Sequence, residues 1–268
     1  MRHSTIFLSI FSLVCASSVY AQNTLNPSNQ PDDPDAAVLP SPWSGSSGEL
    51  GFSSTHGNSV NDNLNARLKG RYTEGDWVHS LDLFANHASA EFTETMPDDS
   101  IRRYRQTTAS RYTAAAGSAL QLGEFRQLTA TGRYERDKFA TYDRLATFGI
   151  GYGTRLINTD KVVLDAQIGP GIRSAHNKPL NRREVGPIAR GLLEFKYSIT
   201  DNTDFTNTLL VESGSYNTFL QNDTSLQVAI NSRFALKASY QVRRNSKTVP
   251  PSKSTDTVAT VNLVYTIK

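Results

Sequence analysis

Residues 225–241 read Ser-Leu-Gln-Val-Ala-Ile-Asn-Ser-Arg-Phe-Ala-Leu-Lys-Ala-Ser-Tyr-Gln. Leu226, Val228 and Ile230 alternate with polar or small residues, and the alternation resumes after Asn231-Ser232-Arg233. Successive side chains of a strand point to opposite faces, so each half predicts a strand with one apolar and one polar face. The polar tripeptide between them predicts a tight turn. The stretch therefore predicts an antiparallel hairpin.

The same alternation recurs along the chain after Trp43 and predicts twelve strands. We expect them within residues 49–52, 64–72, 79–86, 111–120, 128–135, 147–153, 162–173, 190–197, 208–212, 225–231, 233–241 and 261–267. The fold class that this pattern indicates is all-β, an up-and-down antiparallel transmembrane barrel.

The connectors alternate in length along the chain. Short turns are expected at residues 74–76, 123–124, 158–160, 201–203 and 231–233. Longer charged loops are expected at residues 88–104, 136–143, 174–184, 214–223 and 244–255, with 56–59 as a short exception. An up-and-down barrel then has all its short turns at one end, as outer-membrane barrels do.

The apolar faces carry no charge in mid-strand, whereas the opposite faces carry many charges. A soluble barrel or sandwich would also alternate, with its apolar side turned inward. The sorted connectors, the tyrosines near strand ends and an export signal favour a membrane barrel. No segment reaches the roughly 20 apolar residues of a membrane helix.

The N-terminus predicts secretion. Arg2 and His3 precede an apolar run, and Val19-Tyr20-Ala21 fits a signal-peptidase site, so residues 1–21 are expected to be a signal peptide. Five prolines in residues 22–42 predict a disordered periplasmic linker, followed by the barrel from 43 to 268. The one cysteine, Cys15, lies in the signal peptide, so the mature chain has no thiol chemistry. The net charge of +3 over 268 residues does not indicate nucleic-acid binding.

Several motifs resemble the YdiY-like family of salt-induced outer membrane proteins, a domain of unknown function numbered 481. They are Trp43 to Thr55, Gly57-Asn58, and residues 133–139, 169–171, 201–205, 249–251 and 255–257. The resemblance covers about residues 43 to 268 and implies an outer-membrane barrel with no established reaction. It also implies folding by the barrel assembly machinery. That machinery usually reads a terminal aromatic residue, whereas this chain ends Tyr265-Thr266-Ile267-Lys268.

The polar face is the candidate site, because it would line the lumen. Its predicted basic residues are Arg67, Lys69, Arg71, Arg111, Arg133, Arg155, Arg173, Arg190, Lys196, Arg233 and Lys237, with Arg243 as a further candidate. Its predicted acidic residues are Glu49, Asp82, Glu135, Asp165, Glu194 and Glu212. One hypothesis is a narrow pore that favours small anionic solutes. The alternative, which we favour, is a closed lumen filled by cross-strand ion pairs.

Basic loops could contact the phosphates of lipopolysaccharide, or could simply be solvated. The candidates are Arg102, Arg103 and Arg105, then Arg182 and Arg183, then Arg243, Arg244 and Lys247. A lipid-facing hydrolase would need a histidine beside a serine, and His87 and Ser89 share a face. No orienting motif or oxyanion site accompanies them, so we expect no enzyme. No cofactor is expected, and His56, His79 and His176 show no metal spacing. We expect a structural or permeability role in the cell envelope.

Overall fold

The computed structural model describes residues 41–55, 60–248 and 253–267. The predicted signal peptide, the linker up to residue 40, and the connector at 56–59 lie outside the described residues. Where the predicted linker ends, the Pro42 carbonyl already accepts a hydrogen bond from the Thr73 backbone N–H at 2.9 Å. The chain therefore joins the barrel at the residue before Trp43.

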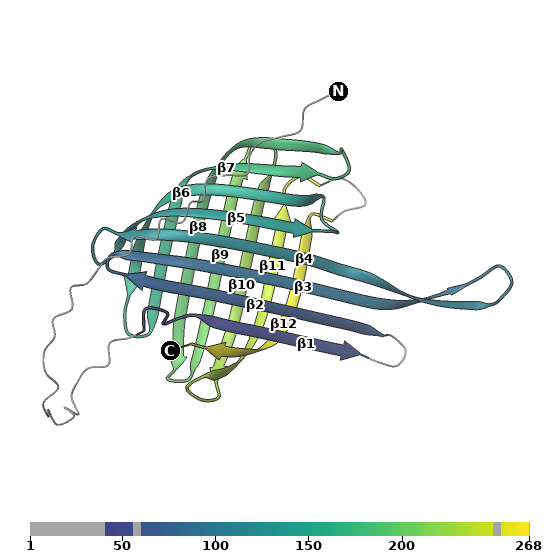
Figure 1. The fold of residues 1–268 in the computed structure, drawn as a ribbon, viewed down its shortest axis with the longest axis horizontal. Helices are drawn as coiled ribbons and strands as arrows, with labels where there is room; N and C mark the ends of the chain where they lie inside the picture. Colours follow the sequence, from purple (N-terminus) through teal and green to yellow (C-terminus); the bar gives the residue numbers. More distant parts are fainter. Residues whose placement is uncertain (1–40, 56–59, 249–252, 268) are drawn as a thin grey trace, which may run out of the picture. The chain divides into compact units, whose positions relative to one another are not determined.

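The described residues form twelve strands, as the alternation predicted. They are β1 (Ser47–Thr55), β2 (Asn61–Glu74), β3 (Trp77–Thr95), β4 (Ile101–Gln121), β5 (Arg126–Asp137), β6 (Tyr142–Asn158), β7 (Val162–Asn177), β8 (Arg182–Thr200), β9 (Thr203–Gly214), β10 (Thr218–Ala229), β11 (Phe234–Asn245) and β12 (Thr255–Thr266). Each strand pairs antiparallel with its sequence neighbours, and β1 pairs with β12 to close the barrel (Figure 1). Among the described residues, no helix is long and apolar enough to cross a membrane.

The cross-strand register separates the two faces. One outward row joins Leu50, Ala66, Ala85 and Tyr112 through direct pairs across β1 to β4. Outward side chains such as Ile150, which is 56% exposed, stay open to the surroundings. The inward row beside it starts at Glu49, which is buried. In a closed barrel one face of every strand points outward and the other points into the lumen. Because successive side chains alternate between the two faces, the barrel has an apolar exterior and a polar lumen.

Most of the long loops predicted between the strands are largely strand, whereas residues 246–248 and 253–254 of the predicted loop 244–255 belong to no strand. Segments 174–184 and 214–223 mostly belong to β7 to β10, and half of segment 136–143 belongs to β5 and β6. The connections shrink to 138–141, 178–181 and 215–217. In segment 88–104 only 96–100 is a turn. The prediction was wrong because most of these residues are polar. Polar side chains hide the alternation in the sequence although the backbone still forms a strand.

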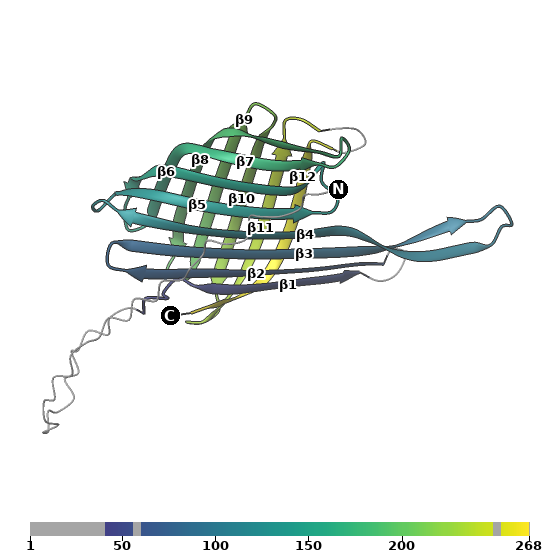
Figure 2. The same cartoon turned by 45° about the horizontal axis from the view of Figure 1, so that its top comes forward.

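The longest extension is the hairpin of β3 and β4, which projects beyond the other strands as a two-stranded ribbon (Figures 1 and 2). Phe92 stacks on Tyr104 across the ribbon, with ring centroids 5.9 Å apart. At its tip the Ser100 hydroxyl and backbone N–H donate to Asp98 and lower the pKa of that carboxyl group. The ribbon is thus an ordered element built from local pairs.

Candidate functional site: the barrel lumen

A layer of side chains crosses the lumen in the half of the barrel that faces the β3–β4 hairpin. Arg243 on β11 pairs with Glu135 on β5. Five strands lie between β5 and β11 in each direction around the barrel, so the two strands are diametrically opposite. The Arg111 guanidinium on β4 donates to the Gln241 side-chain oxygen on β11 at 2.6 Å. Contacts between opposite walls leave little room for a continuous channel at this level. We call this set the loop-side layer, with members Arg111, Arg133, Glu135, Arg173, Glu212, Phe219, Gln241 and Arg243.

Phe219 and Glu212 organise the centre of the layer. The Phe219 ring is 1% exposed and lies between two guanidinium groups, 4.9 Å from that of Arg133 and 5.2 Å from that of Arg243. Cation–π contacts of this kind strengthen where water is excluded. The Glu212 carboxylate, also 1% exposed, accepts hydrogen bonds at 3.0 Å from Arg133 and Arg173. Each central charge therefore has an opposite charge or an aromatic face against it.

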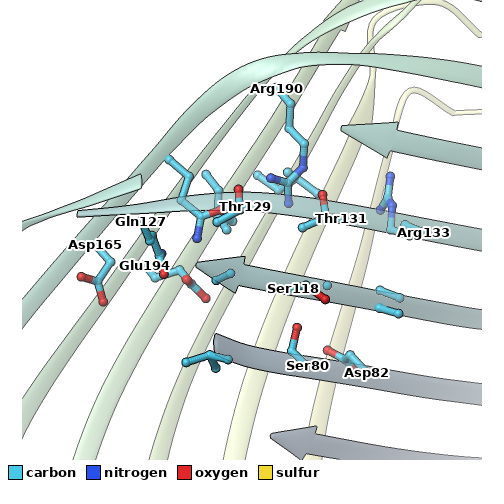
Figure 3. Close-up of a pocket in the computed structure, with 18 of the residues that line it drawn as sticks. Ser80, Asp82, Ser118, Gln127, Thr129, Thr131, Arg133, Asp165, Arg190 and Glu194 are labelled. Atoms are coloured by element: carbon cyan, nitrogen blue, oxygen red, sulfur yellow. The ribbon is translucent and has the colours of Figure 1, made fainter. Parts of the chain in front are cut away.

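Below the layer, toward the short turns, the lumen opens into a chamber. Its main cavity has a volume of about 440 Å³, and a second cavity of about 280 Å³ shares several of its walls. Figure 3 shows Arg190 and Arg133 on one part of the wall and Asp82, Asp165 and Glu194 on others. The chamber is polar and mixed in charge, in contrast to the packed layer above it.

Most of the predicted lumen residues lie on inward register positions, and most are paired. The ion pairs in or beside the chamber are Arg67–Asp82 at 2.5 Å, Arg155–Asp165 at 2.8 Å, Lys237–Glu49 at 2.8 Å and Lys196–Asp204 at 3.1 Å. Arg190 lies 3.9 Å from Glu212. Lys69, Arg71 and Glu194 line the cavities without an ion pair among the described residues. Arg233 differs, because it lies in the exposed turn between β10 and β11 and lines neither of the two cavities of the chamber.

Four inward carboxylates were missed by the sequence reasoning. Asp137 lies 3.5 Å from Arg243, Asp204 pairs with Lys196, and Asp223 accepts from Gln241 at 2.5 Å. Glu184 is buried and accepts from the Tyr142 hydroxyl at 3.4 Å. Asp137, Glu184 and Asp223 fall in or at the edge of segments expected to be loops. With them, the acidic groups of the lumen nearly match the basic ones.

The basic loop candidates separate into different environments. Arg243 belongs to the buried layer rather than to a loop. Arg105 is paired with Asp62, and Arg182 pairs with Glu184 at 3.0 Å. Arg183 donates to the Ser174 hydroxyl at 2.7 Å on the outer surface. Arg243 is therefore not a loop residue, whereas Arg105 and Arg182 remain largely exposed although each has a carboxylate partner.

The proposed hydrolytic pair is not assembled. The Ser89 hydroxyl accepts a hydrogen bond from Arg105 at 3.1 Å, next to a register shift between Ala88 and Ser89. A different pair does meet on the outer face, where His79 Nδ1 lies 2.9 Å from the Ser118 hydroxyl. No carboxylate orients this histidine among the described residues. The described part of the chain also holds no group of three or more potential metal ligands.

Comparison with known proteins gives the family. The model of the protein family of unknown function DUF481 matches residues 48–267. The chain belongs to this family. This DUF481 protein is 28% identical to the uncharacterized protein YdiY of Escherichia coli (strain K12). The aligned region has 165 residues and covers 60% of this chain. The match spans 64% of that relative's length, less than two thirds of it.

Solved structures resemble the DUF481 barrel in fold. The NanC porin superposes with a TM-score of 0.50 at 11% identity, covering 83% of this chain and 100% of that one. The translocator domain of the autotransporter NalP from Neisseria meningitidis superposes with a TM-score of 0.44 at 13% identity, covering 83% and 87%. The NanC match shows an outer-membrane-type barrel fold.

Proposed function

We propose that the protein is an integral barrel of the Gram-negative outer membrane, with a structural or restricted-permeability role and a lumen closed at rest. The apolar exterior supports the membrane, since a closed sheet satisfies its backbone groups internally and can face hydrocarbon. The short turns would lie in the periplasm and the β3–β4 hairpin outside the cell. Fractionation of cells should place the processed protein with outer-membrane markers and not in the periplasm.

The observation that carries the closed lumen is the contact between diametrically opposite strands. Arg243 on β11 reaches Glu135 on β5, and Phe219 fills the space between Arg243 and Arg133. An ion crossing this level would have to displace both guanidinium groups from their carboxylate and aromatic partners. Breaking such a buried, paired arrangement costs several kcal/mol, roughly 3–5 for loss of one partner.

Planar-bilayer recording tests the closed lumen. The wild-type barrel should insert without conductance steps at moderate voltage. Phe219→Ala removes the ring between two guanidinium groups and should produce measurable steps. Phe205→Ala is the matched control, because Phe205 packs edge-to-face against Phe195 on the outer face. Stable open steps from the wild-type protein would contradict the proposal.

The second candidate is a narrow channel that opens under some condition. The polar chamber of about 440 Å³ favours it, because a sealed structural barrel needs no such space. The anion preference expected from the sequence weakens, since inward carboxylates nearly balance the basic groups. If steps are seen, reversal potentials in a salt gradient should therefore show only slight anion preference.

We propose no catalytic activity for the described barrel. Ser89 is bonded to Arg105, and the His79–Ser118 pair lacks an orienting carboxylate among the described residues. General-base activation of serine depends on such an orienting group. Phospholipid hydrolysis by the purified protein that disappears in Ser118→Ala would overturn this.

A further inference from the structure

The outer surface of the barrel carries one row of basic side chains on neighbouring strands. Arg136 on β5 is directly opposite Arg144 on β6, Arg144 is opposite His176 on β7, and His176 is opposite Arg183 on β8. Directly opposite side chains of neighbouring strands are about 4.5–5.5 Å apart. The four therefore form a continuous band across four strands. We call it the basic row.

The row lies where the apolar outer surface of the barrel, which we call the apolar belt, meets the loop end. Each member is within two residues of the end of its strand on the side of the β3–β4 hairpin. Two residues further along the strands lie Tyr134, Ala146, Ser174 and Val185, and the next outward positions include Phe148, Ile172 and Pro187. The basic row thus borders the surface expected to contact acyl chains.

The row carries more positive charge than the protein neutralises. Among the described residues, Asp143 is the carboxylate within ion-pair distance, 2.5 Å from His176 and 3.7 Å from Arg144. Arg136 has no acidic partner in the described part of the chain, and Arg183 bonds only the Ser174 hydroxyl. Like charges directly opposite on a sheet are destabilising. Two facing arginines at this position therefore favour an anion bound between them.

We propose that the basic row binds the phosphate groups of lipopolysaccharide, an inference that rests on the proposed outer-membrane location. Arginine pairs with phosphate oxygens in a bidentate manner. In the proposed orientation the loop end faces the outer leaflet, whose lipopolysaccharide carries phosphates beside its acyl chains. The basic row would then lie level with the phosphates, and the apolar belt would lie level with the acyl chains. An anionic phospholipid or free phosphate could bind the same arginines, and the experiment below distinguishes these ligands from lipopolysaccharide.

Thermal unfolding of the purified, refolded barrel in phosphatidylcholine vesicles tests the proposal. Native lipopolysaccharide should raise the unfolding temperature by about 2–4 °C, the shift expected for roughly 1 kcal/mol in a domain of this size. Chemically dephosphorylated lipopolysaccharide, phosphatidylglycerol and millimolar inorganic phosphate should raise it less than half as much. Equal shifts with any of these three would overturn the assignment to lipopolysaccharide phosphates.

Two triple variants distinguish binding by the basic row from an effect of the overall positive charge of the protein. Arg136→Gln with Arg144→Gln and Arg183→Gln should lose the shift. Without lipopolysaccharide it should unfold at the same or a higher temperature than the wild type, because the facing charges are gone. Arg102→Gln with Arg103→Gln and Arg244→Gln removes equal charge from exposed positions outside the row and should keep the shift.

Two further outcomes keep the test decisive. A row variant that responds to lipopolysaccharide like the wild type overturns the proposal, whatever fractionation shows about location. If the row variant fails to refold, the salt dependence of the wild-type shift decides instead. The shift should fall by more than half between 50 and 500 mM NaCl if exposed phosphate–arginine pairs cause it, and persistence at high salt contradicts it.

Discussion

Glu212 shows how a single buried residue can hold the lumen together. Its carboxylate accepts from Arg133 and Arg173 and lies 3.9 Å from Arg190, so one anion serves three cations. Removing one partner of a buried pair leaves the others without compensation. Three guanidinium groups, on β5, β7 and β8, therefore share this one carboxylate on β9, and that of Arg133 also lies 3.8 Å from Glu135.

Glu212→Gln should therefore lower the free energy of unfolding by about 3–5 kcal/mol. Urea unfolding of the refolded barrel, followed by tryptophan fluorescence, measures the change. Glu194→Gln is the control, because Glu194 is exposed to the chamber and makes no ion pair among the described residues; it should stay within about 0.5 kcal/mol. Equal effects of the two substitutions would show that the three-way pairing is not stabilising.

Gly169 allows β6 and β7 to approach closely. A Cβ atom there would overlap the Ile150 carbonyl oxygen and lie 2.6 Å from the Gly151 Cα. Gly169→Ala should destabilise the barrel by about 1–3 kcal/mol, because backbone atoms must move apart. Gly191→Ala meets no atom within 4 Å and should change stability little. Matching unfolding midpoints for the two variants would rule out this close approach.

At the scale of single residues, alternation placed most of the predicted charged residues on the inward face, with Arg233 as an exception, but it did not predict their partners. Alternation alone assigned Arg67, Asp82 and Glu212 to one face. The pairs across the lumen, such as Arg243 with Glu135, join residues 108 positions apart in the chain. Their meeting depends on barrel diameter and stagger, which a period of two does not contain.

Strand extension explains why the connectors were misjudged. Beyond the apolar belt both faces of a strand meet water, so the alternation fades while the backbone ladder continues. Arg103 pairs with Thr93, and Arg102 with Glu94, in regular antiparallel register. The number and order of strands were predictable from the apolar residues, whereas the ends of the strands were not.

The β3–β4 extension should be dispensable for barrel formation. Ala90 and Gln106 are directly paired, so replacing residues 91–105 with Asn-Gly closes the hairpin with a two-residue turn in the same register. The shortened protein should refold into lipid vesicles with the same heat-modifiable gel mobility and an unfolding temperature within about 4 °C of the wild type. Failure of the shortened protein to refold would mean that the ribbon contributes to assembly.

For the whole molecule, the strands divide space into an apolar outside and a polar inside. This division underlies the proposed location, the closed lumen and the basic row on the outer surface. It was predictable from alternation, and closure of β1 on β12 confirms the fold that makes it possible. The filling of the lumen was predictable only as one of two alternatives, because intermediate barrels can be open or packed.

Quenching of single fluorophores tests this division most directly, since Cys15 is the only cysteine and lies in the predicted signal peptide. Labels on cysteines at Leu68, Ile150 and Val261 should be quenched by brominated acyl chains and not by aqueous iodide. Labels at Thr131, Thr147 and Ser239, which line or face the cavities, should show the opposite. Quenching of the second set by the lipid bromines, with the first set shielded from them, would contradict the barrel as described.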